Sequence, residues 1–425
     1  MVDHHHLFKN FKSSLSLKIP ILKIIFLFLI FVFFSCSSTK RFTSNNSSDF
    51  NSSHSIRVLL NNTSAELTIS VDDEIIVSDD KYSLAEVASG NKLKFSNDRE
   101  KLKLTIGEKE FVKNKFFLTS SDETEIIKID GKKYRGRLIV FVKDSEVKVV
   151  NQIGLEDYTK GVMIKEMPVG KGTENYEALK AFSICIRTYA FNKINENKDF
   201  FDIYPDTRDQ VYGGVDGETE YTNSIVDETR DQILIYDNEP AIIFYHSTCG
   251  GYTEDISNVF SKKNIPYLNG IKDGDEPYCK ISPRYEWVEN YSESIFVERL
   301  YKAKLIESIN YKLSDLKIES RFSSGRINEL DIILNDGQEI QKTIYLMGNQ
   351  IRSIIRNSDG KSILKSTMFN IKIDNENNIV INGKGNGHGV GLCQWGAIGQ
   401  SKKGIDYKNI LNNYFPGTTV ESIYD

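Results

Sequence analysis

The sequence predicts an α+β fold, and two observations lead to this prediction. Within residues 56–150, apolar and polar side chains alternate, as around Leu67 and Ile69, which is the pattern of strands with one buried face. In residues 155–166 and 175–195, apolar side chains recur instead at the spacing of an amphipathic helix. The 425 residues are enough for a large core and, by length, for two or three domains.

The remaining elements are expected in chain order. Residues 137–142 and 147–150 are apolar runs on either side of residues 143–146, which predicts a hairpin. Later parts of the chain are expected to form strands at 233–236 and 241–245 joined by a turn at 237–240, a helix at 294–316, and strands at 327–334 and 369–381.

The N-terminus has the pattern of an export signal. A lysine-rich leader precedes an unbroken apolar run from Ile24 to Phe34. This run is too short for a helix that crosses a hydrocarbon core of about 30 Å. A basic leader, a short apolar core and a small residue before the cut are typical of secretion signals. Residues 1–35 are therefore expected to be a signal peptide.

The junction Ser35-Cys36 is similar to that of a bacterial lipoprotein signal, which makes Cys36 the expected lipidation site. The alternative is an uncleaved membrane anchor. Residues 36–55 are rich in Ser and Asn, and their composition predicts a flexible tether. Both alternatives place the protein outside the cytoplasm, tethered to a membrane at the periplasmic or surface face of the cell envelope.

The charge pattern excludes one class of partner. The formal net charge is −5, and acidic and basic residues are interspersed. Nucleic-acid-binding proteins usually carry a basic stripe, and this chain has none. The sequence therefore predicts no nucleic-acid partner.

One carboxylate occupies an unusual place on the first expected helix. Leu155, Tyr158 and Val162 form one apolar stripe, and Glu166 is the next position on it. Pro168 then ends the helix. Burial raises the pKa of a carboxyl group, which is what a general acid at neutral pH requires. A buried glutamate paired with an arginine is an equally weighted alternative at this point.

A glycine-rich segment covers residues 383–397, G-K-G-N-G-H-G-V-G-L-C-Q-W-G-A. Glycines favour tight loops with positive φ angles and close approach. The segment would present His388, Gln394 and Trp395. It lacks the Lys-Ser/Thr pair of a phosphate-binding loop. A purely structural turn is the alternative.

Several motifs together resemble the SpoIID/LytB family, which comprises sporulation protein D and amidase-enhancer proteins that act on the bacterial cell wall. The family pattern reads E-M-P, then E-A-L-K-A-Q-A-x-A-A-R-T-Y-A, then G-H-G-V-G-x-S-Q-W-G-A. The matches are Glu166 to Pro168, Glu177 to Ala181, Arg187 to Ala190 and His388 to Ala397. The departures are Phe182 for glutamine, Asn386 for a common tryptophan and Cys393 for serine.

The resemblance implies a domain organisation. Residues 56–150 would be the β-rich N-terminal part of a SpoIID-like unit. Residues 151–417 would be its catalytic core, with a β-rich insertion at about 288–380. The expected fold is thus an α+β catalytic domain with a β-rich flanking portion.

The resemblance also implies an activity. Glu166 corresponds to the family's catalytic glutamate, so the chain is expected to be a lytic transglycosylase, a carbon–oxygen lyase of peptidoglycan. It would cleave glycan strands already stripped of stem peptides and leave 1,6-anhydro-muramyl ends. No second acidic residue stands out, and this mechanism needs none. The alternative is a non-catalytic, peptidoglycan-binding amidase enhancer. The expected partners are glycan strands, a cell-wall amidase and the membrane.

Other residues are candidates for contacts with the glycan. Gln210 and Tyr212 lie in a loop similar to the family's Q-x-Y-x-G element, with ordinary loop packing as the alternative. Arg187 lies beside an apolar stripe and could reach a cleft or form an ion pair. The full substrate-binding set is Arg187, Tyr189, Gln210, Tyr212, Ser247, His388 and Gln394.

The cysteines leave three alternatives open. Cys185 lies among apolar residues and reads as a buried thiol. Cys249 and Cys279 are expected to lie close in space, either as a disulfide or, with His246, as ligands of a structural zinc ion. His388 and Cys393 are less favoured ligands, and unpaired cysteines are the third alternative. No cofactor is required for the expected chemistry.

Overall fold

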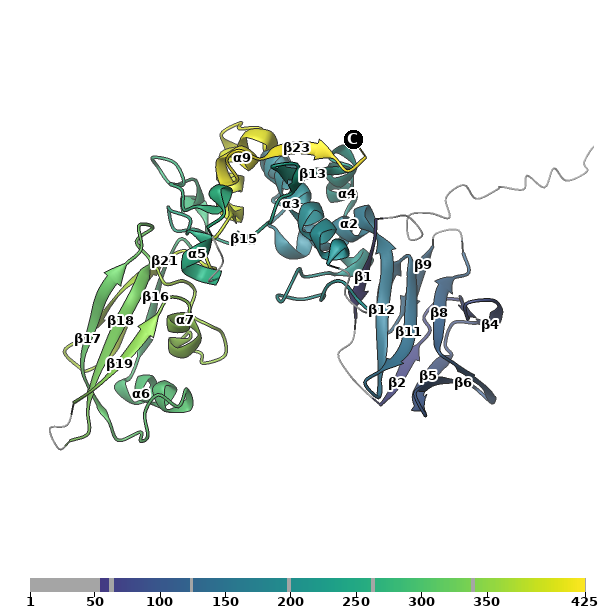
Figure 1. The fold of residues 1–425 in the computed structure, drawn as a ribbon, viewed down its shortest axis with the longest axis horizontal. Coiled ribbons are helices and arrows are strands. Elements are labelled where there is room, and N and C mark those ends of the chain that lie inside the picture. Colours follow the sequence, from purple (N-terminus) through teal and green to yellow (C-terminus); the bar gives the residue numbers. More distant parts are fainter. Residues whose placement is uncertain are drawn as a thin grey trace, which may run out of the picture. The chain divides into compact units, whose positions relative to one another are not determined.

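The computed structural model describes residues 54–60, 65–122, 125–196, 200–260, 264–337 and 341–424. It contains both helices and strands, which confirms the α+β prediction (Figure 1). The expected signal peptide, Cys36 and nearly all of the expected tether lie outside the described residues. Among the described residues, no helix has the length and apolar character needed to cross a membrane.

The N-terminal part is built from two antiparallel sheets. The larger has the order β1 (Ser55–Leu59), β12 (Glu146–Gly154), β11 (Arg137–Lys143), β8 (Lys115–Ser120), β3 (Ile75–Ser78), β4 (Ser83–Val87). The smaller has the order β2 (Glu66–Ser70), β5 (Lys92–Asp98), β6 (Lys101–Ile106), β7 (Lys109–Lys113). A separate hairpin joins β9 (Ile126–Ile129) and β10 (Lys132–Arg135).

Alternation of side chains explains how these sheets pack. Leu102 and Leu104 of β6 are fully buried. The rings of Phe95 and Phe116, one from each sheet, lie 6.2 Å apart. The predicted hairpin is confirmed as β11–β12, and its turn contains Asp144, whose φ is 51°. A positive φ is typical of tight hairpin turns, because their twist matches that of the strands.

Two helices follow directly. They are α2 (Leu155–Glu166) and α3 (Tyr176–Asn195), as the spacing of apolar residues predicts. Leu155, Tyr158 and Val162 are buried on the predicted stripe. Helix α2 ends at the expected place, because Met167 is its C-cap and Pro168 follows.

Short elements complete this part of the molecule. The 3-10 helices η2 (Thr173–Asn175) and η3 (Gly214–Gly217) flank α3 in sequence, and α4 (Glu220–Glu228) follows them. A small sheet has the order β14 (Glu239–Pro240), β13 (Gln232–Tyr236), β23 (Thr419–Ser422). The C-terminal helices are α8 (Gln394–Lys402) and α9 (Tyr407–Tyr414).

The strand predicted at 241–245 is wrong for most of its length. Only β15 (Tyr245–His246) is a strand there, and it pairs in parallel with β22 (Leu392–Cys393). Burial still alternates before it, with Ile243 buried and Ile242 exposed, but the Ile242 N–H donates to the Tyr267 hydroxyl at 2.8 Å and not to a neighbouring strand.

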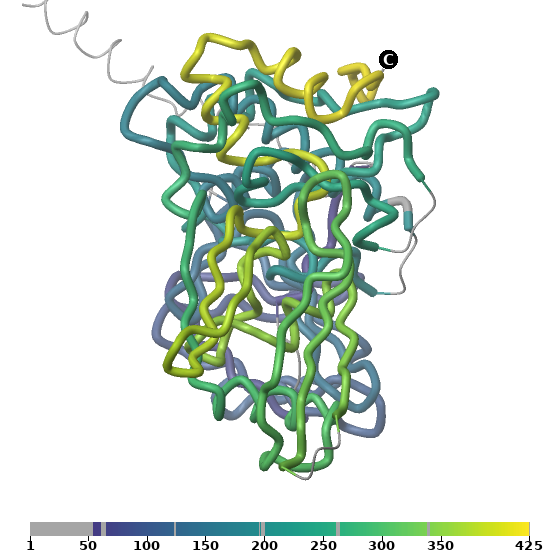
Figure 2. The backbone as a smooth tube through the Cα atoms, turned by 90° about the vertical axis from the view of Figure 1, so that its left-hand side faces the viewer, coloured from purple at the N-terminus to yellow at the C-terminus, as the bar shows by residue number. Residues whose placement is uncertain are grey.

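Residues 286–384 form a β-rich segment with its own hydrophobic cluster. One sheet has the order β16 (Glu286–Tyr291), β21 (Ile379–Lys384), β20 (Phe369–Ile373), and another the order β17 (Lys312–Arg321), β18 (Ile327–Asn335), β19 (Gln341–Met347). The helices α6 (Glu293–Lys302) and α7 (Gln350–Ile355) contact β17 and β19 respectively. Figure 2 shows the long green hairpins of β17, β18 and β19.

The prediction of one helix over 294–316 is wrong beyond Lys302. Helix α6 stops there, Lys304 has a φ of 59°, and β17 begins at Lys312. The pairing of β17 with β18 outweighs the helical pattern of its first residues. The strands predicted at 327–334 and 369–381 are confirmed, the second as the pair β20–β21.

Candidate active site

A cavity of about 470 Å³ brings together residues that are far apart in the sequence. They come from the end of α2, from α3, from the loop before η3, from the segment around β15, from α7 and from the glycine-rich loop. The lining residues are Glu166, Tyr189, Thr207, Arg208, Asp209, Ile243, Phe244, Tyr245, Phe260, Arg352, Gly387 and His388.

Glu166 is a carboxylic acid in the cavity lining, and its pKa is raised. Burial raises the pKa of its carboxyl group, and the backbone N–H of Val211 opposes this by donating to Oε1 at 2.6 Å. The net direction is upward from the usual 4.5. The side chain is half-buried, so it can be both desolvated and reached from the cavity. The expectation that Glu166 lies toward the packed side and has a raised pKa agrees with this geometry.

The glycine-rich segment of residues 383–397 holds the backbone of Glu166. The Gln394 side chain donates from Nε2 to the Glu166 carbonyl oxygen at 2.8 Å. Gln394 is only 6% exposed, so it positions the end of α2 and does not face the sugar. The prediction that Gln394 binds substrate is therefore corrected to a positioning role.

The loop that supplies Val211 packs tightly on α2 through glycines. Gly213 donates its N–H to the Gly161 carbonyl at 2.9 Å. A Cβ atom on Gly217 would lie 2.1 Å from the Gly161 carbonyl oxygen. Only glycine allows this close approach of the loop to the backbone of α2.

Gln210 and Tyr212 were predicted to contact sugars, and the structure corrects this. Both are buried. Tyr158 donates its hydroxyl to the Gln210 amide oxygen at 3.1 Å, and Tyr212 donates its hydroxyl to the Asn151 amide oxygen at 2.8 Å. They anchor the loop from inside the protein, which is the packing alternative of the sequence analysis.

Arg187 is also corrected, from a substrate ligand to a structural ion pair. Its side chain is fully buried and makes a forked pair with Glu156, with N···O distances of 2.8 and 2.7 Å. It also donates to the Gln232 carbonyl. A buried arginine with these partners has no access to the cavity.

Tyr189, one of the residues predicted to bind substrate, lines the cavity. It also contacts a carboxylate that the sequence analysis did not propose as a site residue. Its hydroxyl donates to Asp209 Oδ1 at 2.7 Å, and the Tyr204 N–H donates to Oδ2 at 2.9 Å. Asp209 is thus a second carboxylate on the cavity wall. Its position beside Gln210 was the only signal available, and no spacing rule singles it out.

His388 lines the cavity with a neutral ring. Nδ1 accepts from the Val390 N–H at 3.1 Å, so Nε2 carries the proton and donates to the Tyr245 carbonyl at 2.9 Å. Burial lowers its pKa to about 3. Ser247, by contrast, is absent from the cavity lining, and its carbonyl accepts from the Trp395 N–H at 3.1 Å. The Ser247 prediction therefore finds no support in this geometry.

The β-rich segment contributes one cation to the cavity. Arg352 of α7 donates from Nε to the Leu364 carbonyl at 2.8 Å, and burial lowers its pKa to about 10, so it stays charged at neutral pH. A neighbouring cavity of about 470 Å³ shares Tyr189 and Phe244 with the first and continues to Lys193. The aromatic side chains shared by the two cavities are those of Tyr189, Phe244 and Phe260.

The cysteines gather away from this cavity. Cys249 and Cys279 have their sulfurs 3.4 Å apart, which confirms that they are close in space. Cys393 and Asp273 join them, whereas His246, whose Nδ1 bonds the Val390 carbonyl at 3.1 Å, is not part of this group. The predicted ligand His246 is therefore replaced by residues that the sequence analysis ranked lower or missed.

Comparisons with known proteins agree with the motifs. The profile of the SpoIID family, described as stage II sporulation protein, matches residues 143–236. A profile for a domain of unknown function, DUF8618, matches residues 280–391. An uncharacterized protein of Brachyspira hyodysenteriae is 32% identical over 299 residues, covering 69% of this chain and 73% of the relative.

Two relatives from Bacillus subtilis have descriptive names. The amidase enhancer is 28% identical over 392 residues, which cover 84% of this chain and 52% of the relative. Stage II sporulation protein D is 27% identical over 291 residues, which cover 64% of this chain and 75% of the relative.

Proposed function

The chain belongs to the SpoIID/LytB family, whose function is related to the cell wall, and from this premise we propose that it is a peptidoglycan lytic transglycosylase. The observation that carries the proposal is Glu166, a cavity-lining carboxyl group whose pKa is raised by desolvation. A general acid with a raised pKa keeps its proton closer to neutral pH.

One carboxyl group can carry the whole reaction. Protonated Glu166 donates its proton to the glycosidic oxygen as the C1–O bond breaks. The 6-hydroxyl of the same muramic acid attacks C1 and forms the 1,6-anhydro ring. The Glu166 carboxylate takes the proton of that hydroxyl and is restored. No water is consumed, and no enzyme nucleophile is needed.

Asp209 could turn the same cavity into a hydrolase, because glycoside hydrolases use two carboxylates. Each of its oxygens, however, already accepts a hydrogen bond, from Tyr189 and from the Tyr204 backbone. These bonds fix Asp209 as part of the wall and favour the transglycosylase mechanism, with Glu166 alone cycling the proton.

The cations of the cavity support a preference for stripped strands. Removal of stem peptides leaves a free lactyl carboxylate on each muramic acid. Arg208 and Arg352 both line the cavity, but the Arg208 guanidinium already forms a forked pair with Asp206 at 2.8 and 2.6 Å. A guanidinium pairs well with a carboxylate through two parallel hydrogen bonds. We propose that Arg352 binds lactyl groups of the glycan.

The second candidate function is a wall-binding protein that stimulates an amidase, and the amidase enhancer of B. subtilis favours it because the alignment covers 84% of this chain. Incubation of stripped glycan with the wild type and with Glu166→Gln separates the two functions. The exposed Glu108 provides the matched control Glu108→Gln.

Transglycosylase activity predicts soluble products from the wild type and Glu108→Gln. Glu166→Gln should lose about 10²–10⁴-fold in rate, because it cannot cycle a proton. It should still sediment with the glycan. A wild type that binds glycan and releases nothing would instead establish the wall-binding function.

We further propose that the protein is an exported lipoprotein held at the membrane through Cys36. Its sequence context, Ser-Cys directly after the apolar run that ends at Phe34, supports this. Growth with a labelled fatty acid should label the wild type and leave Cys36→Ala unlabelled and released. A wild type without label would overturn the anchor.

A further inference from the structure

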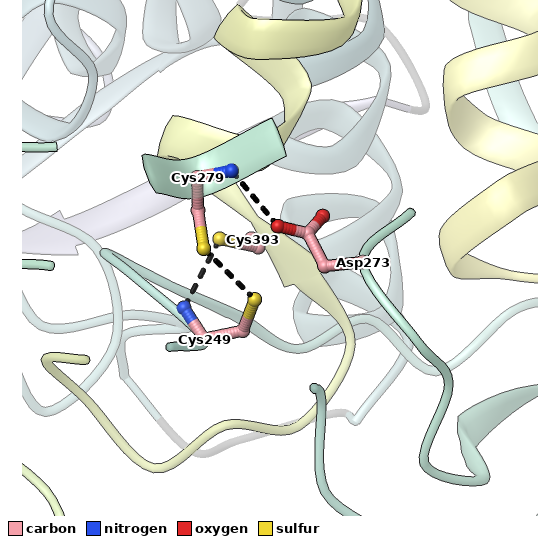
Figure 3. A group of neighbouring side chains, drawn as sticks. All are labelled: Cys249, Asp273, Cys279 and Cys393. Carbon is pink, nitrogen blue, oxygen red and sulfur yellow. Dashed lines mark hydrogen bonds between the residues drawn. The ribbon is translucent and has the colours of Figure 1, made fainter. Parts of the chain in front are cut away.

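We propose that Cys249, Cys279, Cys393 and Asp273 bind one structural Zn²⁺ ion. The three sulfurs and a carboxylate oxygen lie within 4.8 Å of one another, and all four residues are buried (Figure 3). They come from the loop after β15, the segment before and within η5 (Tyr278–Ile281), and β22. Nothing in their separate sequence contexts has a paired C-x-x-C pattern.

The geometry and chemistry of the group fit zinc. Tetrahedral coordination with Zn–S bonds of about 2.3 Å places ligand atoms about 3.8 Å apart. The 3.4 Å between the sulfurs of Cys249 and Cys279 is close to this value. Thiolates are preferred zinc ligands, and a closed set of four protein ligands is typical of structural sites.

Backbone N–H groups already point at the sulfurs. The Cys249 N–H donates to the Cys393 sulfur at 3.2 Å, and the Gly396 N–H donates to it at 3.3 Å. The Gly251 N–H donates to the Cys249 sulfur at 3.4 Å. Such donors stabilise thiolates and orient them, as outer partners do around bound metals.

Asp273 is held as a ligand would be. The Tyr414 hydroxyl donates to its Oδ1 at 2.6 Å, and the Cys279 N–H donates to its Oδ2 at 2.9 Å (Figure 3 shows the second bond). Ligating carboxylates usually carry hydrogen bonds of this kind. The three neighbouring cysteines carry no positive charge. A cation among them would therefore supply the counter-charge of the buried Asp273 carboxylate.

A buried arginine beside the cluster gives an independent indication of charge. Arg326 is 2% exposed and donates to the carbonyls of Cys249 and Tyr252 at 2.7 and 2.8 Å. No carboxylate of the described residues forms an ion pair with it. A buried guanidinium needs a counter-charge. The thiolates of the cluster supply it together with the buried Glu254 carboxylate. Within the cluster, Zn²⁺ with Arg326 balances all but one of the four negative charges.

A disulfide explains less. A bond between Cys249 and Cys279 would leave the third thiol, the buried carboxylate and the buried guanidinium without a common partner. Zinc uses all of them. The ligand set also differs from the one that the sequence predicts, because Cys393 and Asp273 take the place of His246.

Through Cys393, the ion would stabilise the glycine-rich segment that contacts the end of α2 at Glu166. Cys393 immediately precedes Gln394, whose side chain holds the Glu166 carbonyl. Cys249 and Cys279 anchor loops that precede the β-rich segment. Only this effect on Glu166 rests on the proposed function. The metal site itself does not.

The test is metal analysis of the full chain, purified under reducing conditions and dialysed after addition of Zn²⁺. The wild type should hold about one ion per chain, and Co²⁺ in its place should show thiolate charge-transfer and tetrahedral absorption bands. Cys393→Ser and Asp273→Asn should lower metal affinity at least about 10-fold. Cys185→Ser, at a buried thiol in α3, and His246→Gln should keep the full content.

Two results would overturn the site. One is a reduced, folded wild type that retains no Zn²⁺. The other is loss of metal in His246→Gln with full content in both Cys393→Ser and Asp273→Asn. If Zn²⁺ is bound as predicted while stripped glycan is not cleaved, the metal site stands and the transglycosylase proposal fails, so the two are separable.

Discussion

Glu166 should control how glycan cleavage depends on pH. Because burial raises its pKa above 4.5, the protonated acid persists to higher pH than in an exposed glutamate. Cleavage should therefore be constant at low pH and fall as pH rises through the raised pKa. His388 does not contribute to this limb, since its pKa is about 3.

The measurement is kcat/KM for stripped glycan across the pH range in which circular dichroism shows an unchanged fold. A single falling limb above pH 4.5 agrees with Glu166 as the acid. A rate that rises with pH over the same range would show that the ionised carboxylate starts the reaction, which contradicts the proposed order of steps.

Arg187 and Glu156 should be important for stability and not for sugar binding. Arg187→Met leaves a buried carboxylate unpaired, which costs about 3–5 kcal/mol of unfolding free energy. The double variant with Glu156→Leu should recover most of this loss, because no charge then remains buried. Urea unfolding measures both, with the exposed Lys302→Met as a control. Equal losses in the single and double variants would contradict the pairing.

The sequence predicts the role of a residue when that role depends on its position along a helix. It does not predict a role that depends on a contact with a distant residue. The apolar stripe of α2 predicts that Glu166 faces the packed side, because helix geometry fixes direction. The same geometry places Arg187 beside a stripe but cannot reveal Glu156, 31 residues earlier. Asp209 acquires its role only from Tyr189 and a backbone N–H, which no local pattern encodes.

At the scale of elements, the contact between η3 and α2 should set the activity of Glu166. Gly217→Ala would place a Cβ atom 2.1 Å from the Gly161 carbonyl, and backbone atoms cannot move aside cheaply. The expected cost is about 1–3 kcal/mol of unfolding free energy. Displacement of the loop should also lengthen the Val211–Glu166 bond and slow cleavage.

Gly172→Ala is the matched control, because a Cβ atom there meets nothing within 4 Å. Denaturant midpoints and cleavage rates for the two variants give the comparison. If Gly217→Ala and Gly172→Ala behave alike, the close contact does not position the catalytic loop.

A helix or strand is predicted correctly where the local spacing of apolar residues agrees with the tertiary contacts of that segment. Helices α2 and α3 follow their apolar spacing, and the β11–β12 hairpin follows its flanking runs. The helix predicted over 294–316 fails at Lys302, because β17 gains a long pairing with β18 that a window of sequence cannot show.

At the scale of the whole molecule, the β-rich segment should tune substrate binding through Arg352. Loss of a charge-assisted hydrogen bond of about 1.5–3 kcal/mol predicts that Arg352→Met binds stripped glycan about 10–100-fold more weakly. Cleavage at saturation should change little. The exposed Lys361→Met is the control of equal charge. Equal affinity of both variants would show that Arg352 does not contact the glycan.

Contacts between residues far apart in the sequence form the thiol cluster and the cavity, and the sequence alone does not predict such contacts. Cys249 and Cys393 are 144 residues apart, yet the parallel pair β15–β22 brings them together. The approach of Arg352 to Glu166 in one cavity likewise depends on the fold of the intervening chain. Motif order predicts the family and the acid, whereas the cavity and the thiol cluster require the folded molecule.

The most direct test of the central claim is the chemistry of the glycan ends made in ¹⁸O-labelled water. A transglycosylase consumes no water, so the products should be lighter than the hydrolysis products by one water and should contain no ¹⁸O. Glu166→Gln should yield almost none of them. Reducing ends that carry one ¹⁸O would contradict the account and indicate a hydrolase that uses Glu166 together with Asp209.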